Sequence, residues 1–216
     1  MRDRSARYWD RAARRYARRP VADVAAYERK LELARVCLGP ETEALEFGCG
    51  TGSTALALAA DVKRIRAIDV SAEMIGIARE KAAAAKIPNV AFETAAFDSF
   101  QAPDAAFDAV LGLNVLHLLD DWPAAVAKTY RLLKPGGVFL SSTACLADDM
   151  NWLRWIVPAG RAVGLLPEVA FFGEATLMRT IEQAGFEIDR SWKPGPRKAV
   201  FVVATKPRDG QASVTG

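Results

Sequence analysis

The sequence lacks the features that mark several large classes of protein. It contains one histidine and three scattered cysteines, which provide neither a paired set of metal ligands nor a disulfide framework. No apolar run approaches the roughly 20 residues of a membrane-spanning helix, and the first residues include no apolar signal-peptide core. The formal net charge of +3 is too small to indicate nucleic-acid binding by itself. These absences predict a soluble cytoplasmic protein with reduced thiols and without a metal.

The composition is instead that of one α/β domain. The chain has 216 residues, of which 51% are hydrophobic and 25% charged, and this length permits a substantial core. Apolar segments with strand character alternate with helical segments, which predicts right-handed βαβ units around a parallel sheet. After a last helix, two strands joined through a Pro/Gly turn predict an antiparallel hairpin at a sheet edge. The expected strands lie near 43–48, 64–69, 89–93, 107–113, 137–142, 185–192 and 198–206, and the expected helices near 52–60, 72–85, 121–133 and 174–184.

No linker divides the chain into two domains. Residues 1–38 are predicted to form two lid helices, and residues 39–206 the main domain. Within that domain, residues 146–173 carry many apolar and aromatic side chains. They predict a cap insertion over a hydrophobic cleft, and packing of the cap on the core explains them equally well. Residues 207–216 are expected to be a disordered tail.

The first helical stretch is strongly basic. Eight arginines precede Pro20, and aromatic and alanine residues recur between them at helical spacing. One interpretation is a solvated lid helix whose aromatic stripe packs on the domain, since charge runs usually form solvated faces. Contact with an anionic membrane surface or with RNA is the alternative. The stripe consists of Tyr8, Trp9, Ala12, Ala13 and Tyr16.

The segment ALEFGCGTGS, residues 44–53, predicts a ligand site. A glycine-rich turn between a first strand and its helix presents backbone N–H groups at a helix N-terminus and lets a ligand approach closely. A dinucleotide site usually has the pattern G-x-G-x-x-G. Here the glycines are Gly48, Gly50 and Gly52, and Ser53 stands where the last dinucleotide glycine would be.

Two carboxylates flank this turn. Glu46 precedes the first glycine by two residues, where it would repel a pyrophosphate and attract a ligand that carries a sulfonium and an ammonium group. Asp69 ends the second strand about 20 residues later, which suits hydrogen bonds to a ribose diol. Ser71 fits the N-cap of the following helix, which leaves Asp69 free for the ligand. The turn therefore favours a cationic nucleoside cofactor.

Four segments of the chain share a pattern with a known family: ALEFGCGTGS, IDVSAEMIGIARE, FDAVLGLNVLHLLDD and RLLKPGGVFLSST. Together they resemble the class I S-adenosylmethionine-dependent methyltransferases, most strongly the small-molecule type that methylates quinones and lipids. The resemblance extends from about residue 8 to residue 205. It implies a three-layer Rossmann-like fold, with a seven-stranded, mostly parallel sheet and an antiparallel C-terminal hairpin. It also implies S-adenosyl-L-methionine as cofactor and S-adenosyl-L-homocysteine as product.

The same resemblance implies which residues bind each part of the cofactor. Glu46 and the glycine loop would hold the methionine moiety, and Asp69 the ribose hydroxyls. Val70 and Met74 would flank the adenine, and Tyr16 would close the pocket from the N-terminal helix. The loop residues assigned to the cofactor are Gly48, Cys49, Gly50 and Gly52.

One position departs from the family pattern. Enzymes of this type commonly have Gly-Asp after the third strand, where the acid accepts the adenine amino group, whereas this chain has Ala95-Ala96. Either Asp98 replaces that acid, or backbone groups and water read the amine while Phe97 packs nearby. In both cases we expect Ala96 and Phe97 to belong to the adenine pocket.

The fourth strand ends at a position that favours contact with the reacting groups. Asn114 is expected to touch the methionine end of the cofactor or the substrate. His117, the one histidine, is a candidate general base because its ordinary pKa lies near neutrality, and a structural or pocket-lining role is the alternative. The Asn/Asp-Pro-Pro-aromatic tetrapeptide of many nucleobase and glutamine methyltransferases is absent.

The sequence thus predicts methyl transfer to a small, hydrophobic acceptor that is quinone-, lipid- or natural-product-like. The alternatives are an RNA methyltransferase that uses the basic helix, a nicotinamide-dependent oxidoreductase, and a cofactor-binding protein without turnover. The basic helix also allows peripheral contact with a membrane. A nucleic-acid partner is not favoured, and nothing in the sequence predicts an oligomeric state.

Overall fold

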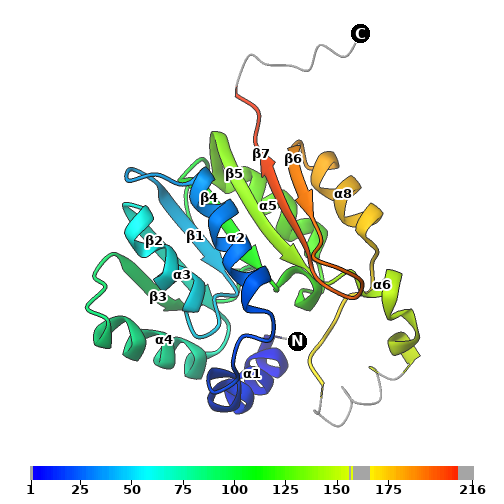
Figure 1. Ribbon diagram of the computed structural model, residues 1–216, viewed down its shortest axis with the longest axis horizontal. Coiled ribbons are helices and arrows are strands. Elements are labelled where there is room, and N and C mark those ends of the chain that lie inside the picture. Colours follow the sequence, from blue (N-terminus) through cyan, green and yellow to red (C-terminus); the bar gives the residue numbers. More distant parts are fainter. Residues whose placement is uncertain (1, 156, 158–165, 209–216) are drawn as a thin grey trace.

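A seven-stranded sheet forms the centre of the molecule (Figure 1). The computed structural model describes residues 2–155, 157 and 166–208. The strands follow the order β3-β2-β1-β4-β5-β7-β6, and of the described strands β7 alone runs in the opposite direction to the others. This confirms the predicted fold class and the C-terminal hairpin. The strands are β1 (Glu43–Phe47), β2 (Arg64–Asp69), β3 (Val90–Thr94), β4 (Phe107–Leu113), β5 (Leu133–Thr143), β6 (Glu187–Trp192) and β7 (Val200–Thr205).

Helices cover both faces of this sheet and complete the three layers. One face carries α2 (Val24–Cys37), α3 (Ser53–Leu58) and α4 (Ala72–Ala84), whose apolar side chains share a buried cluster with β1, β2 and β3. The other face carries α5 (Trp122–Leu132) and α8 (Glu174–Gln183), which bury a second cluster. Short helical turns connect these elements: η1 (Ala59–Asp61), η2 (Leu116–Leu118), α6 (Leu146–Asp149) and η3 (Asn151–Trp155).

The central strands are apolar on both faces because helices cover both. In β1, Leu45 and Phe47 belong to the cluster beneath α5 and α8, whereas Ala44 belongs to the cluster beneath α2 to α4. Strand alternation therefore directs Glu46 to the same side as Ala44. That carboxylate is only 3% exposed, and it is a polar exception in an otherwise apolar strand.

The sheet order creates a crevice between β1 and β4. The chain leaves β1 toward β2 and β3 on one side, and returns to β4 and β5 on the other. Ligands bind open α/β sheets at such a switch point, outside the carboxyl ends of the strands. The glycine loop follows β1 and Asn114 follows β4, so the topology brings these two segments to the same edge.

Helix α1 (Arg2–Ala17) lies below the carboxyl ends of the parallel strands (Figure 1). Its Asp10 accepts hydrogen bonds from Ser71 Oγ at 2.6 Å and from the backbone N–H of Glu73 at 3.2 Å. Asp10 therefore docks α1 on the first turn of α4, where free N–H groups attract a carboxylate.

The two N-terminal helices differ in their packing. Leu31, Leu33 and Ala34 of α2 are buried in the core on one sheet face, whereas α1 contacts the edge at which the strands end. Of the two helices predicted to form a lid in residues 1–38, α2 packs in the core. We therefore propose a lid role for α1 alone.

The cap predicted for residues 146–173 is described only in part. Residues 156 and 158–165, and residues 209–216 of the predicted tail, lie outside the described residues. Phe172 is buried and stacks on Trp122, with ring centroids 4.1 Å apart, while Trp152 and Trp155 are 61% and 78% exposed. Packing on the core thus explains Phe172 but neither tryptophan. Among the described helices, none has the length and apolar composition needed to span a membrane.

The contact of Asp10 with α4 can be tested by limited proteolysis. We expect Asp10→Ala to accelerate tryptic cleavage within α1 several-fold, because loss of a helix-capping carboxylate costs about 1 kcal/mol. The matched control is Glu28→Ala, which removes an exposed carboxylate from α2. Equal cleavage of both variants and the native protein would show that Asp10 does not hold the helix.

Candidate functional site

A cavity of about 650 Å³ lies at the carboxyl edge of the parallel strands. Its walls come from α1 and from the loops that follow β1, β2, β3 and β4. This volume falls within the range of small-molecule sites, roughly 300–1,000 Å³. Nine of the residues predicted for cofactor binding line it: Tyr16, Gly48, Gly50, Asp69, Val70, Met74, Ala96, Phe97 and Asn114.

Glycine is required at the positions of this loop for different structural reasons. All three glycines have positive φ, at +67° for Gly48, +53° for Gly50 and +74° for Gly52. A Cβ atom on Gly52 would lie 2.7 Å from the ring of Phe92 and 2.9 Å from Ala78, so this glycine allows α4 and β3 to pack closely. A Cβ atom on Gly50 would meet only the Tyr16 ring, at 3.9 Å, and would point into the cavity region. Close approach of a ligand is thus open at Gly50 and not at Gly52.

Glu46 lies buried behind this loop with an unsatisfied oxygen. Its carboxyl group accepts a hydrogen bond from the backbone of Ala55 in the first turn of α3, while Oε2 has no hydrogen-bond partner among the described residues. Burial, reinforced by the nearby charge of Asp69, raises the pKa of Glu46 to about 8. A buried carboxylate without a partner is costly, and a cation placed beside it would remove that cost.

Asp69 connects the ends of β1 and β2. Its Oδ2 accepts the backbone N–H of Gly50 at 2.8 Å, and its Oδ1 accepts that of Ser71 at 2.9 Å. Ser71 is the N-cap of α4, as expected, because its Oγ accepts the N–H of Met74. Asp69 is not the N-cap, as expected, but it is not wholly free for a ligand, because each of its oxygens already accepts a backbone hydrogen bond. A carboxylate has about four acceptor positions, so acceptor capacity remains for a ligand.

Burial raises the pKa of Asp69 above its ordinary value, and hydrogen bonds from the backbone of Ser71, Gly50 and Val70 oppose that shift. Tyr16 experiences the same environment, because burial and the charges of Asp69 and Glu46 raise the pKa of its phenol. The loop therefore has two buried carboxyl groups beside it, which favour a cation. A basic side chain also reaches the loop, because Lys81 Nζ donates to Thr51 Oγ1 at 2.8 Å and to the Thr51 carbonyl oxygen at 3.2 Å.

The side of the cavity beyond β3 is aromatic. The ring of Phe97 stacks on that of Phe47, with centroids 4.0 Å apart and an interplanar angle of 13°. Lys128 of α5 donates hydrogen bonds to the carbonyl oxygens of Phe97, at 2.6 Å, and of Phe100, at 2.6 Å. These bonds fix the loop that carries Ala96, Phe97 and Asp98, all of which line the cavity.

Asn114 enters the cavity from the end of β4 in a left-handed conformation, with φ +57°. Its backbone N–H donates to the Ser142 carbonyl oxygen at 2.6 Å, and its Oδ1 accepts from Ser142 Oγ at 3.4 Å. Ser142 Oγ also accepts from Lys30 Nζ at 2.8 Å. Lys30 is partly buried, and that burial lowers its pKa. β5 and α2 therefore fix the orientation of the Asn114 amide.

His117 is not brought together with these residues. It lies on η2, outside the group that lines the cavity, and its Nδ1 is buried without a hydrogen-bond partner among the described residues. Burial lowers its pKa to about 4, so the ring is neutral at neutral pH. Glu46, Cys49 and Gly52 also lie behind the cavity wall rather than in it.

Comparisons with known proteins agree with this geometry. Residues 44–137 match the family model of a methyltransferase domain. The chain is similar to the malonyl-[acyl-carrier protein] O-methyltransferase of Serratia marcescens, with 35% identity over 48% of this chain and 39% of that protein. It is also similar to a probable S-adenosylmethionine-dependent methyltransferase of Mycolicibacterium smegmatis, with 31% identity over 73% of this chain and 56% of that protein. The chain thus spans about half the length of these curated relatives, or less.

The fold has relatives among solved structures. An S-adenosylmethionine-dependent methyltransferase of Thermotoga maritima superposes with a TM-score of 0.69, covering 94% of this chain and 99% of that one at 23% identity. Residues 44–137 form a class I S-adenosylmethionine-dependent methyltransferase domain. S-adenosylmethionine is the cofactor of this family, and the unpaired Oε2 of Glu46 together with the open approach at Gly50 fits a cationic ligand.

Several residues that line the methyltransferase cavity were missed from the sequence. They come from α1, from the ends of β1 and β4, from the stretch between β4 and α5, from α5 itself, and from the cap. Trp9 could have been found, because it precedes Tyr16 by seven residues on the same aromatic stripe. Phe47 and the residues between Leu113 and Asp121 lie within segments of the family resemblance, but those segments do not show which side chains face a ligand, because that depends on how the loops fold. The missed residues are Ser5, Trp9, Phe47, Leu113, Val115, Leu118, Leu119, Asp120, Asp121, Ala124, Ala125, Lys128 and Glu168.

Gly50 and Gly52 of the methyltransferase loop provide a matched pair of variants. We expect Gly52→Ala to lower the free energy of unfolding by about 2–4 kcal/mol, because its Cβ meets Phe92 and Ala78 at positive φ. Gly50→Ala should cost about 1 kcal/mol in stability and weaken S-adenosylmethionine binding about tenfold or more. Urea denaturation and calorimetry would measure these effects, and equal stability losses would contradict the assignment.

Proposed function

We propose that this protein transfers the methyl group of S-adenosylmethionine to a small, hydrophobic acceptor. The observation that carries the proposal is the buried carboxylate of Glu46 beside the open glycine loop. Its orphaned oxygen and its pKa near 8 suit a cation far better than the pyrophosphate of a dinucleotide. The nicotinamide-dependent alternative is therefore disfavoured.

In this proposal, different residues around the loop bind different parts of the cofactor. Glu46 faces the positively charged methionine end through the loop, and Gly50 lets that end approach the backbone. The remaining acceptor positions of Asp69 bind the ribose hydroxyls. Val70 and Phe97 enclose the adenine from two sides. The departure at Ala96 leaves the adenine amine to backbone groups or to Asp98, which also lines the cavity.

The cavity lining includes apolar side chains that the cofactor assignment does not use. They are Trp9, Leu118 and Leu119, and they support binding of a hydrophobic molecule. Asp120, Asp121 and Glu168 also line the cavity, and their charge would repel an anionic acceptor. We therefore propose a neutral or cationic acceptor with a sizeable apolar part. The Serratia marcescens relative, by its name, methylates an acyl group on a carrier protein, and the substrate of this chain is a separate question.

Alignment is the main contribution that these residues make to the reaction. When bound, S-adenosylmethionine supplies a methyl group on a good leaving group, which a nucleophile displaces in line. α1 closes the cavity through Trp9 and Tyr16 and excludes water. The fixed Asn114 amide restricts the approach of the acceptor, and restricted geometry alone is worth several kcal/mol of a barrier. No step requires His117, whose side chain lies outside the cavity.

The acceptor class can be tested with a methyl-labelled cofactor. Purified protein, labelled S-adenosylmethionine and fractionated cell extract are incubated together, with Gly50→Ala as the matched inactive control. We expect label in the fraction soluble in organic solvent and none with the variant. Label in the RNA fraction would contradict the hydrophobic acceptor and support RNA as the acceptor. Cofactor binding without label in any fraction would favour a protein without turnover.

Glu46 makes cofactor binding depend on pH. Because its pKa lies near 8 without cofactor, Glu46 is mostly protonated at pH 7, and a bound cation should displace up to one proton. Affinity should therefore rise as pH increases toward 8 and level off above it. Calorimetry in buffers of different ionisation enthalpy measures the proton release, which Glu46→Gln should abolish. Equal release by both proteins would show that Glu46 does not face the cation.

His117 is expected to act in stability rather than in catalysis. Its folded pKa, about 4, lies below the ordinary value of 6.5, so its contribution to stability is complete above pH 6.5 and is lost as pH falls toward 4. His117→Gln should remove this part of the acid sensitivity, measured by urea denaturation between pH 4 and 7. Methyl transfer should change less than about threefold, whereas loss of a general base costs about 100-fold or more.

A further inference from the structure

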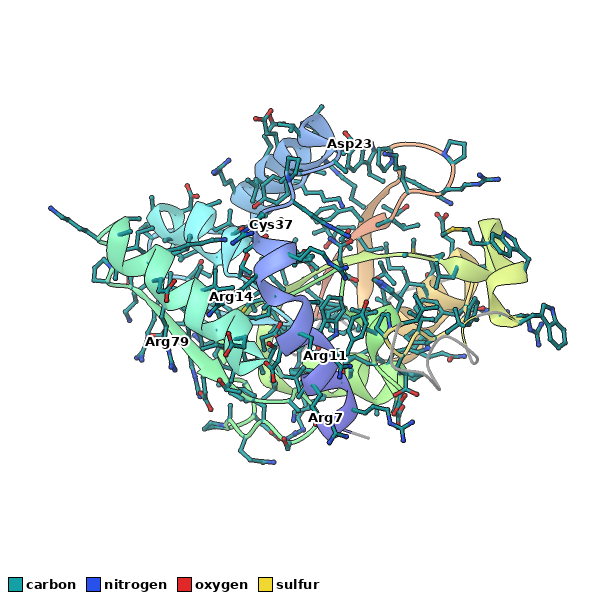
Figure 2. The ribbon with its side chains drawn as sticks, turned by 90° about the horizontal axis from the view of Figure 1, so that it is seen from below. Arg7, Arg11, Arg14, Asp23, Cys37 and Arg79 are labelled. Atoms are coloured by element: carbon teal, nitrogen blue, oxygen red, sulfur yellow. The ribbon has the colours of Figure 1, made fainter. Side chains whose placement is uncertain are left out.

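The arginines of α1 gather on one face of the helix. Five of them, together with Arg18 directly after the helix, lie at positions that fall on one side of a helix. All six are exposed. Figure 2 shows three of them, Arg7, Arg11 and Arg14, spaced along α1 in the view from below. The six are Arg4, Arg7, Arg11, Arg14, Arg15 and Arg18.

The opposite face of α1 is occupied by the rest of the molecule. Ser5, Trp9 and Tyr16 line the cavity, and Ala13 is completely buried. Asp10 binds the first turn of α4. The arginine face therefore points outward while the helix is held in place from behind. Asp10 and Ala13, which hold the helix against the domain, lie on the other face.

Exposed apolar side chains flank this basic face. Val21 and Val24, just beyond the end of α1, are 48% and 55% exposed. On η3, Trp152 and Trp155 are the most exposed of the tryptophans, and the Arg154 guanidinium lies 5.3 Å from the centre of the Trp155 ring. In Figure 1, α1 lies at the bottom of the molecule and α6 at its right-hand side, and Glu168, which follows the α6–η3 segment in the chain, lines the same cavity as α1.

We propose that the arginine face of α1 and the exposed tryptophans of η3 form one docking surface for a bilayer that contains anionic lipids. A helix with a basic face and neighbouring apolar groups lies in the plane of a membrane surface, where each basic residue adds to the attraction. Indole rings favour the same interfacial depth, because one edge is polar and the rest apolar. Charge complementarity thus identifies the partner as a negatively charged surface.

The apolar flanks favour a bilayer over RNA as that surface. Val21 and Val24 gain nothing from a phosphate backbone, whereas they lose water-exposed area when they enter the boundary between headgroups and acyl chains. Docking in this orientation places the mouth of the cavity, which α1 covers, next to the bilayer. The inference does not require methyl transfer, since binding to vesicles is measured without any reaction.

The test is cosedimentation of the full chain with vesicles at 0.1 M salt. Vesicles of equal parts phosphatidylglycerol and phosphatidylcholine are compared with vesicles of phosphatidylcholine alone. We expect binding to the anionic vesicles only, and its loss at 0.5 M salt because added ions screen the charges. Equal binding to both vesicle types, or none to either, would overturn the proposal.

Two triple variants locate the surface. Arg7→Gln, Arg14→Gln and Arg15→Gln together should weaken partitioning on the order of 100-fold. The matched control, Arg64→Gln, Arg179→Gln and Arg190→Gln, removes the same charge from exposed positions on β2, α8 and β6 and should retain at least a third of the native affinity. Circular dichroism and S-adenosylmethionine binding would establish that both variants fold. Equal losses in the two variants would overturn the assignment to α1.

Two further measurements test the role of the tryptophans and the RNA alternative. Trp152→Ser with Trp155→Ser should weaken vesicle binding about tenfold without changing its salt dependence. Fluorescence polarisation with a labelled single-stranded RNA tests the rival partner. If the arginine variant loses RNA binding while the native protein shows no preference for anionic vesicles, the surface binds RNA and the proposal fails.

Discussion

The two backbone hydrogen bonds of Asp69 are the constraint on which the site depends. One oxygen holds Gly50 and the other holds Ser71, so a single carboxylate ties the loop after β1 to the start of α4. Ser71 in turn binds Asp10 of α1. The glycine loop, the second strand and the covering helix are thereby one connected unit. A change in any of them would move the wall of the cavity.

Behind this unit lies a carboxylate that the apoprotein leaves unsatisfied. Glu46 gains one backbone hydrogen bond from α3 and otherwise carries the full cost of burial. Such a group stabilises the fold little, and its energetic value appears only with a cation nearby. α1 shows a similar division between its faces, since one closes the cavity and the other carries exposed arginines. In our proposals, both features use charge for binding rather than for stability.

Much of this arrangement could be predicted from local patterns. The strand and helix order, the final hairpin and the Ser71 N-cap each follow from a few adjacent residues, and the structure agrees with them. The role of Gly52 could not be predicted in the same way, because its neighbours Phe92 and Ala78 come from other elements. His117 was also misleading, since an apolar run with one histidine does not reveal whether the ring faces a cavity.

The sequence by itself determined the class of fold and the chemical character of the loop, because hydrophobic periodicity, glycines and a nearby carboxylate are local properties of the chain. Only the tertiary structure decided which of these residues share a cavity. Leu118, Asp120 and Glu168 meet Trp9 there, although they come from distant segments. Their meeting depends on sheet order and on the docking of α1, and those depend on long-range packing that no short stretch of sequence encodes.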